Sequence, residues 1–178
     1  MGSAREFPVE HTARMPSGCA IRPRAPGFTL IELLIAMVVL AILATIAYPT
    51  YTEFVMRSRI IDATSQLNDY RTRMEQAFQD NRRYDNPAGI CAVTAQIPAL
   101  DPARDNFGFA CTFTAGALGG YSLDATGNAA KGMSGFTYRL ATDPTTGALT
   151  RSTPGVAPGW SVPAPNTCWA VRKNGYCS

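Results

Sequence analysis

The sequence predicts an α+β fold in which one long N-terminal helix packs against a small antiparallel sheet. Three features of the 178 residues support this prediction. Residues 28–48 form a nearly unbroken apolar run, residues 56–77 carry an apolar stripe with helical spacing, and segments after residue 106 alternate apolar and polar side chains. The chain is long enough for one modest domain and an anchor.

The apolar run has the length of a membrane span. Its 21 residues would rise about 31 Å as a helix, close to one hydrocarbon thickness. Arg22 and Arg24 precede it, so the positive-inside rule predicts a cytoplasmic N-terminus with the rest of the chain outside. A cleaved secretory signal is a poorer interpretation, because the run is long for such a signal and no A-x-A site follows. A passive anchor would not explain Glu32, whose carboxylate is costly in hydrocarbon.

The segment GFTLIE, residues 27–32, continues into a further apolar run and resembles the class III signal of type IV pilins and pseudopilins. In that family a prepilin peptidase cuts after the glycine on the cytoplasmic face, and the new N-terminal residue is N-methylated. The resemblance implies a leader at 1–27, cleavage between Gly27 and Phe28, and methylation of Phe28. The leader departs from the family pattern, because Pro26 stands where Lys or Arg is common. Translation from Met15 would give a leader of 13 residues, a more typical length than 27.

The same resemblance gives Glu32 a role in assembly. Cleavage would free an α-amine at Phe28 that is cationic near neutral pH. An amine and a carboxylate are each costly in lipid, and they offset one another when they meet. In the family, the carboxylate of an incoming subunit pairs with the N-terminal amine of a neighbour in the growing filament. Glu32 is therefore expected to be an assembly determinant and not a catalyst.

Residues 28–81 are expected to form one helix, with a transmembrane and assembly half at 28–49 and an amphipathic half at 50–81. Pro49 lacks an N–H and clashes with the preceding turn, so a kink is expected there, as the pilin resemblance also implies.

The second half of the helix carries the apolar stripe that the sheet is expected to bury. Arg71 and Glu75, four residues apart, are expected to pair on its wetter side. The stripe consists of Met56, Ile60, Ala63, Leu67, Tyr70, Met74 and Ala77.

Residues 82–178 are expected to form the globular part, with an αβ-loop, an antiparallel sheet and a C-terminal disulfide loop. Strands are predicted at 107–114, 121–127 and 136–142, with a turn at Gly147 leading into a further strand. The sheet would cover the helix stripe, because an amphipathic helix alone is not stable in water. Residues 154–166, PGVAPGWSVPAPN, are expected to be a Pro-rich surface loop.

Four cysteines follow the leader, an even number that suits an exported, disulfide-bonded domain. They allow three connectivities. Cys91–Cys111 and Cys168–Cys177 are the favoured pairs, because each closes a local loop. The second pair would staple a hairpin with Asn174 and Gly175 in its turn, and this segment resembles the C-terminal disulfide region of type IVa minor pilins.

Arg172 and Lys173 are expected at the tip of that loop, with Trp169 and Tyr176 nearby. Cations beside aromatic rings can contact the phosphates and bases of DNA, as in DNA-uptake pilins. A solvated turn beside two buried rings is the simpler interpretation and is favoured.

Composition argues against an enzyme. After residue 27 the chain has 12 basic and 11 acidic residues, so net charge does not indicate nucleic-acid binding. No G-x-S-x-G, Walker, zinc or dinucleotide motif occurs, the cysteines lack CxxC spacing, and the one histidine is His11. No cofactor and no metal site are expected.

The sequence is thus identified as a member of the type IV pilins, most similar to a type IVa minor pilin. The resemblance implies other pilin subunits, prepilin peptidase and the inner-membrane pilus assembly machinery as partners. It also implies a single-pass inner-membrane protein before assembly and an extracellular filament afterwards. Pilus biogenesis, twitching motility, adhesion and DNA uptake remain open as roles. The alternatives are a DNA-binding pilin for natural transformation and a type II secretion pseudopilin, of which Pro49 and the disulfides disfavour the second.

Overall fold

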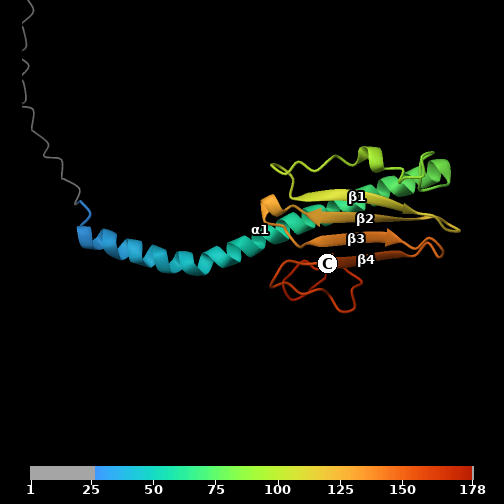
Figure 1. Ribbon diagram of the computed structural model, residues 1–178. Helices are drawn as coiled ribbons and strands as arrows, with labels where there is room; N and C mark the ends of the chain where they lie inside the picture. Colours follow the sequence, from blue (N-terminus) through green and yellow to red (C-terminus); the bar gives the residue numbers. More distant parts are fainter. Residues whose placement is uncertain (1–26, 178) are drawn as a thin grey trace, which may run out of the picture. The chain divides into compact units, whose positions relative to one another are not determined.

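The computed structural model describes residues 27–177, so the leader expected at 1–27 lies almost entirely outside the described residues. A helix of 52 residues, α1 (Leu30–Asn81), precedes a four-stranded antiparallel sheet (Figure 1). This is the α+β architecture that the sequence predicts. The chain divides into two compact units after Leu43.

The helix α1 begins at Leu30 because Thr29 caps it. The Thr29 hydroxyl accepts a hydrogen bond from the backbone N–H of Glu32 at 3.2 Å, which satisfies one of the free donors of the first turn. Thr29 and Glu32 are spaced as in a capping box, where an acid at the third helical position also suits the positive end of the helix dipole.

Pro49 lies inside α1, and the helix continues through it. Two hydroxyls beside the proline donate to nearby backbone carbonyls: Thr50 to Ile46 at 3.5 Å and Thr52 to Pro49 at 2.9 Å. Threonine hydroxyls often bond carbonyls three or four residues earlier in a helix, and such bonds can bend the helix. The kink at Pro49 stays a prediction.

The four strands follow one another as an antiparallel meander in the order β1-β2-β3-β4. They are β1 (Phe107–Thr114), β2 (Gly120–Gly127), β3 (Thr137–Thr142) and β4 (Leu149–Gly155). Two 3₁₀ turns, η1 (Thr94–Gln96) and η2 (Ala129–Lys131), lie in the connections. The three strand segments read from the alternation of side chains are confirmed to within one residue, and a further strand, β4, follows Gly147 as expected.

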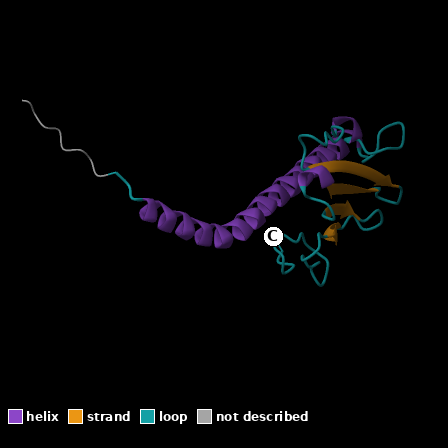
Figure 2. Ribbon diagram, turned by 60° about the vertical axis from the view of Figure 1, so that its left-hand side comes forward, coloured by secondary structure: helices purple, strands orange, loops and turns teal. Residues whose placement is uncertain are grey.

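The core lies between one face of the sheet and the C-terminal half of α1, which crosses that face (Figure 2). From the helix stripe, Ile60, Leu67 and Met74 are fully buried, and from the sheet, Leu123 and Leu140. The predicted stripe is therefore the buried face of the helix. Its two end members, Met56 and Ala77, are half-buried.

The prediction that residues 154–166 form a loop wholly at the surface is wrong. Trp160 is only 8% exposed, and its ring packs edge-on against Phe136 with 4.9 Å between ring centroids. Pro163 is also buried. The loop folds back because a large apolar ring is far more stable in the core than in water.

Candidate functional site

The apolar residues 28–48, called the stem below, are all exposed. Phe28 is 85% exposed, and the least exposed large side chain of the stem, Val39, is 48% exposed. Glu32 is the one charged residue of the stem. Within residues 27–177, α1 is the one helix long and apolar enough to cross a membrane, and this fits membrane anchoring.

The predicted cleavage site lies directly before α1. Gly27 and Phe28 are exposed and outside regular secondary structure. A Cβ built on Gly27 would meet nothing within 4 Å, so packing does not explain why a glycine stands there. An exposed peptide bond that lies just before a helix and outside regular secondary structure is accessible to a peptidase.

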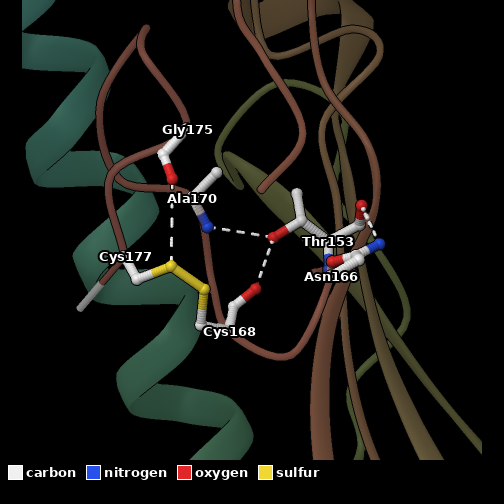
Figure 3. Close-up of a disulfide and its surroundings, with 6 residues drawn as sticks. All are labelled: Thr153, Asn166, Cys168, Ala170, Gly175 and Cys177. Atoms are coloured by element: carbon white, nitrogen blue, oxygen red, sulfur yellow. Dashed lines mark hydrogen bonds between the residues drawn. A yellow bond between two sulfur atoms is a disulfide. The ribbon is translucent and has the colours of Figure 1, made fainter. Parts of the chain in front are cut away.

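The C-terminal loop, residues 166–177, is stapled by the Cys168–Cys177 disulfide, one of the two pairs favoured from the sequence (Figure 3). The N–H of Val171 donates to the carbonyl of Tyr176 at 2.9 Å, and that of Gly175 donates to the carbonyl of Arg172 at 3.1 Å. Gly175 has φ +72°, a conformation that favours glycine, and so it supplies the turn as expected.

Thr153 of β4 holds this loop against the edge of the sheet (Figure 3). Its hydroxyl donates to the carbonyl of Cys168 and accepts from the N–H of Ala170, both at 2.9 Å. The side-chain amide of Asn166 bonds both the N–H and the carbonyl of Thr153, at 2.7 and 3.0 Å. The outward-facing polar groups of Thr153 on this edge strand are thereby satisfied within the chain.

The structure places Arg172 and Lys173 on the exposed turn of this loop, as the sequence predicts. Of the two rings expected to be buried beside it, Trp169 is buried, but Tyr176 is 67% exposed, so the expectation is wrong for Tyr176. The ammonium group of Lys173 lies 3.7 Å from the carboxylate of Glu53 on α1, which also pairs with Arg57. Arg172 forms no salt bridge with another residue in the described part of the chain. Of the two cations, Arg172 is therefore the freer one.

Sequence reasoning missed a third cation, Arg151 of β4. Its guanidinium lies 5.3 Å from the centre of the buried Trp169 ring, a cation–π arrangement that fixes its position while it stays exposed. The indole N–H of Trp169 donates to the carbonyl of Arg139 at 3.0 Å, so the ring is itself held in place.

Charge is distributed unevenly along residues 44–178. Residues 144–178 contain Arg151, Arg172 and Lys173 and no acidic residue, whereas residues 44–143 contain nine basic and ten acidic ones. Counting charges by segment would have found this cationic segment from the sequence. The nearly balanced charge of the chain after residue 27 conceals this cationic segment, because residues 44–143 carry one more acidic than basic residue.

The second disulfide, Cys91–Cys111, is the other favoured pair and ties the αβ-loop to β1. Nearby, the expected pairing of Arg71 with Glu75 does not form. The carboxylate of Glu75 instead accepts from the hydroxyls of Tyr84 at 3.2 Å and Tyr121 at 3.4 Å. Burial, with the Glu75 charge beside it, raises the pKa of both tyrosines, so both remain protonated donors.

No group of three or more His, Cys, Asp or Glu side chains suited to a metal ion occurs in residues 27–177. The four cysteines within residues 27–177 form the two disulfides. The site features are thus an apolar stem with one carboxylate and a stapled cationic loop.

A long N-terminal helix with an exposed apolar first half and a second half packed on an antiparallel sheet, together with a stapled C-terminal loop, is the arrangement of type IV pilins. Residues 22–48 match the prokaryotic N-terminal methylation motif. Residues 49–149, more than half of the chain, match the family described as type IV minor pilin ComP, DNA uptake sequence receptor. The chain belongs to this family of type IV minor pilins.

Curated relatives resemble the chain over a shorter stretch. The type IV major fimbrial protein FimA of Dichelobacter nodosus is 39% identical over 59 residues, 33% of this chain and 37% of FimA. The type IV major pilin PilA of Myxococcus xanthus is 40% identical over 62 residues, 35% of this chain and 28% of PilA. A fimbrial protein of Pseudomonas aeruginosa is 38% identical over 56 residues, 32% of this chain and 36% of that protein. The chain thus matches about a third of these relatives' length, and no solved structure matches it significantly.

Proposed function

We propose that this protein is a DNA-binding minor pilin that is built into a type IV filament. The observation that carries the proposal is the match of residues 49–149 to a family described as a DNA uptake sequence receptor. The cationic segment 144–178 lies almost wholly outside that match and is independent support, because its charge was not part of the comparison.

Maturation follows from the N-terminal motif. Prepilin peptidase removes the leader after Gly27, and Phe28 becomes the methylated N-terminus. The stem holds the subunit in the inner membrane with its N-terminus in the cytoplasm until the assembly machinery transfers it to the filament. There the carboxylate of Glu32 pairs with the N-terminal amine of a neighbouring subunit.

The DNA contact surface comprises Arg151, Arg172 and Lys173. Arg151 is held by the ring of Trp169, and Arg172 carries no salt bridge in the described residues, so both guanidinium groups can meet phosphates at little cost. Lys173 would first have to leave Glu53, so its contribution is smaller. Tyr176, 67% exposed, offers a ring on which a base can stack.

DNA binding by the detergent-solubilised full chain tests the proposal, with the affinity measured over a series of salt concentrations. Each phosphate contact that is lost should reduce the salt slope by about 0.9. Reversing Arg151 and Arg172 to glutamate should therefore reduce the slope by about 2 and weaken binding at every sequence. Arg104→Glu is the control, since Arg104 is exposed but lies far along the chain from the cationic segment.

The two possible failures are distinguishable. If the unaltered protein binds no DNA at any salt concentration, the proposed function is wrong. If it binds DNA and the double reversal has no more effect than Arg104→Glu, the function stands and the proposed surface is wrong.

Glu32 is tested with two substitutions, because it also occupies the third position of a capping box. Glu32→Gln keeps a side chain that can bond the first turn, whereas Glu32→Ala removes it. Both variants should be processed and methylated normally and be depleted from sheared filaments, as measured by mass spectrometry. Normal incorporation of Glu32→Gln would contradict the charge-pairing mechanism.

A further inference from the structure

A hollow of about 240 Å³ opens on α1 directly after the stem and begins at Pro49. Two cations line it, Arg57 of α1 and Lys173 of the C-terminal loop, together with the carboxylate of Glu53. This carboxylate forms salt bridges with both cations, since it pairs with Arg57 and lies 3.7 Å from the ammonium group of Lys173. Two cations thus share one carboxylate, and the hollow has one positive charge in excess.

Two further cations lie on the opposite side of α1. Arg59 follows Arg57 by two residues, so its side chain leaves the helix about 200° away. The guanidinium of Arg59 donates to the carbonyl of Lys131 in η2 at 2.7 Å. Neither Arg59 nor Lys131 forms a salt bridge within residues 27–177. The four residues Arg57, Arg59, Lys131 and Lys173 are called the basal cations below.

Two carboxylates screen this second pair in part. A hydrogen bond from a backbone N–H lowers the pKa of the Asp105 carboxyl most, and the charges of Arg104 and Lys131 lower it further. The salt bridge of Asp105 is with Arg104, at 3.4 Å. The other carboxylate is that of Asp62, which follows Arg59 by three residues on α1. With both carboxylates and Arg104 counted, this side of α1 also has one positive charge in excess.

The hollow lies at the depth where a bilayer presents its headgroups. Phe54 in its lining follows Tyr48, the last residue of the stem, by six residues, which is about 9 Å of helix. The headgroup layer is about 5–8 Å deep, and the potential of an anionic surface extends about 8 Å further at physiological salt. Arg57 and Arg59 follow Tyr48 by about 14 and 17 Å, and long side chains lean toward the N-terminus of their helix, here toward the stem. Both guanidinium groups are therefore within reach of that potential.

Exposed aromatic rings lie at the same depth. Tyr48 and Tyr51 are 73% and 66% exposed, and Phe54 is 68% exposed. Tyrosine is enriched where a span meets the headgroups, because its ring is apolar and its hydroxyl is polar. The positive-inside rule disfavours cations on the outer side of a span, so an excess of cations beside these rings calls for an anion there.

We infer that the basal cations bind the anionic headgroups of membrane phospholipids before the subunit is assembled. The inference rests on the membrane stage of the proposed function and names the lipid class that this stage uses. A bilayer surface surrounds α1 and meets its opposite sides at one depth, which matches the two pairs of cations. A DNA duplex is a rod and would contact the cations of one side only. A headgroup with a net negative charge, such as that of phosphatidylglycerol, is the ligand that fits.

Binding of phospholipids to the full chain in detergent tests the inference, with the bound lipid counted by native mass spectrometry. The unaltered protein should bind phosphatidylglycerol at least about tenfold more tightly than phosphatidylcholine. Each cation at an anionic surface contributes about fivefold, and the excess is two charges. The preference should fall as the salt concentration rises. Changing Arg57→Gln, Arg59→Gln and Lys131→Gln together should abolish it.

A matched control changes three exposed arginines near the C-terminal end of α1 and should keep the preference. These changes are Arg73→Gln, Arg82→Gln and Arg83→Gln. Arg57→Lys with Arg59→Lys should also keep it, since attraction to headgroups needs the charge and not the planar guanidinium. Loss of the preference in this pair would show that the two side chains act through folding, which overturns the inference.

Three other outcomes decide the matter. Equal binding of the two lipids by the unaltered protein, or an equal loss in the control, overturns the inference. The triple glutamine variant of the basal cations should keep the salt slope of DNA binding. A smaller slope would assign these cations to DNA and overturn the inference, while the proposed function stands. If the full chain is not recovered with the inner membrane of cells, the membrane stage of the proposed function is wrong and the inference is wrong with it.

Discussion

Replacing Thr153 by valine should loosen the C-terminal loop without changing the shape of the side chain. The valine removes the hydroxyl that bonds both Cys168 and Ala170. Thr153 and Ala170 are fully buried, so the N–H of Ala170 loses its partner and water cannot replace it. Cys168 is half-buried, so its carbonyl is partly rescued by water.

The magnitude follows from these two groups. A buried donor left unsatisfied costs about 1–3 kcal/mol, and a partly solvated carbonyl costs about 0.5–1 kcal/mol. The free energy of unfolding should fall by about 1.5–4 kcal/mol, which lowers the melting temperature of a domain of about 130 residues by roughly 5–15 °C.

The assay is thermal unfolding of the full chain in detergent, followed by tryptophan fluorescence. Both tryptophans report on the relevant region, since Trp160 is 8% and Trp169 3% exposed. Thr150→Val is the matched control: Thr150 is an exposed threonine on the same strand, whose hydroxyl bonds the carbonyl of Ala141 at 3.2 Å. If Thr153→Val costs no more than Thr150→Val, the loop is not held by this hydroxyl and the account of the site is wrong.

Three further outcomes are expected. Leu67→Ala should lower the free energy of unfolding by about 3–4 kcal/mol in a denaturant titration, because Leu67 is fully buried at the centre of the helix stripe. Cys168→Ser with Cys177→Ser should lower it by about 2–3 kcal/mol under oxidising conditions, with no difference from the parent once both are reduced. The backbone N–H groups of Thr146 and Thr145 lower the pKa of the Asp143 carboxyl, so its contribution to stability is present above the unfolded pKa and is lost as pH falls through the lower folded value. Asp143→Asn should therefore be less stable than the parent at neutral pH, and its free energy of unfolding should fall less steeply as the pH drops below about 4. Denaturant titrations over this pH range test the expectation, and an equally steep fall in the variant would refute it.

Local patterns in the sequence predicted the secondary structure well. The spacing of Ile60, Leu67 and Met74 predicted the buried face of α1, since the period of a helix fixes which side chains share a face. Alternation predicted the strands for the same reason. The cysteine pairing favoured from loop length is the pairing in the structure, because near neighbours in sequence meet most readily.

Local sequence patterns did not predict contacts between residues that lie in different segments of the chain. Nothing local indicated that Asn166 would clamp Thr153, that Trp160 would enter the core, or that Glu75 would bond two tyrosines in place of Arg71. Each of these depends on the path of the chain between the two partners, which periodicity does not encode.

The sequence by itself determined the membrane-length stem, its single carboxylate, the N-terminal methylation motif and the four cysteines that follow it, since these are properties of composition and short-range order. The tertiary structure decided which cations are free. It brought Lys173 to Glu53, set Arg151 against Trp169, and left Arg172 without a salt bridge among the described residues. It also placed the stapled loop beside α1, so that Phe54, Ile61 and Val171 line one groove. The reason is physical: the charge and shape of a surface depend on which groups the fold brings within a few ångströms of each other, and those groups are not neighbours in the sequence.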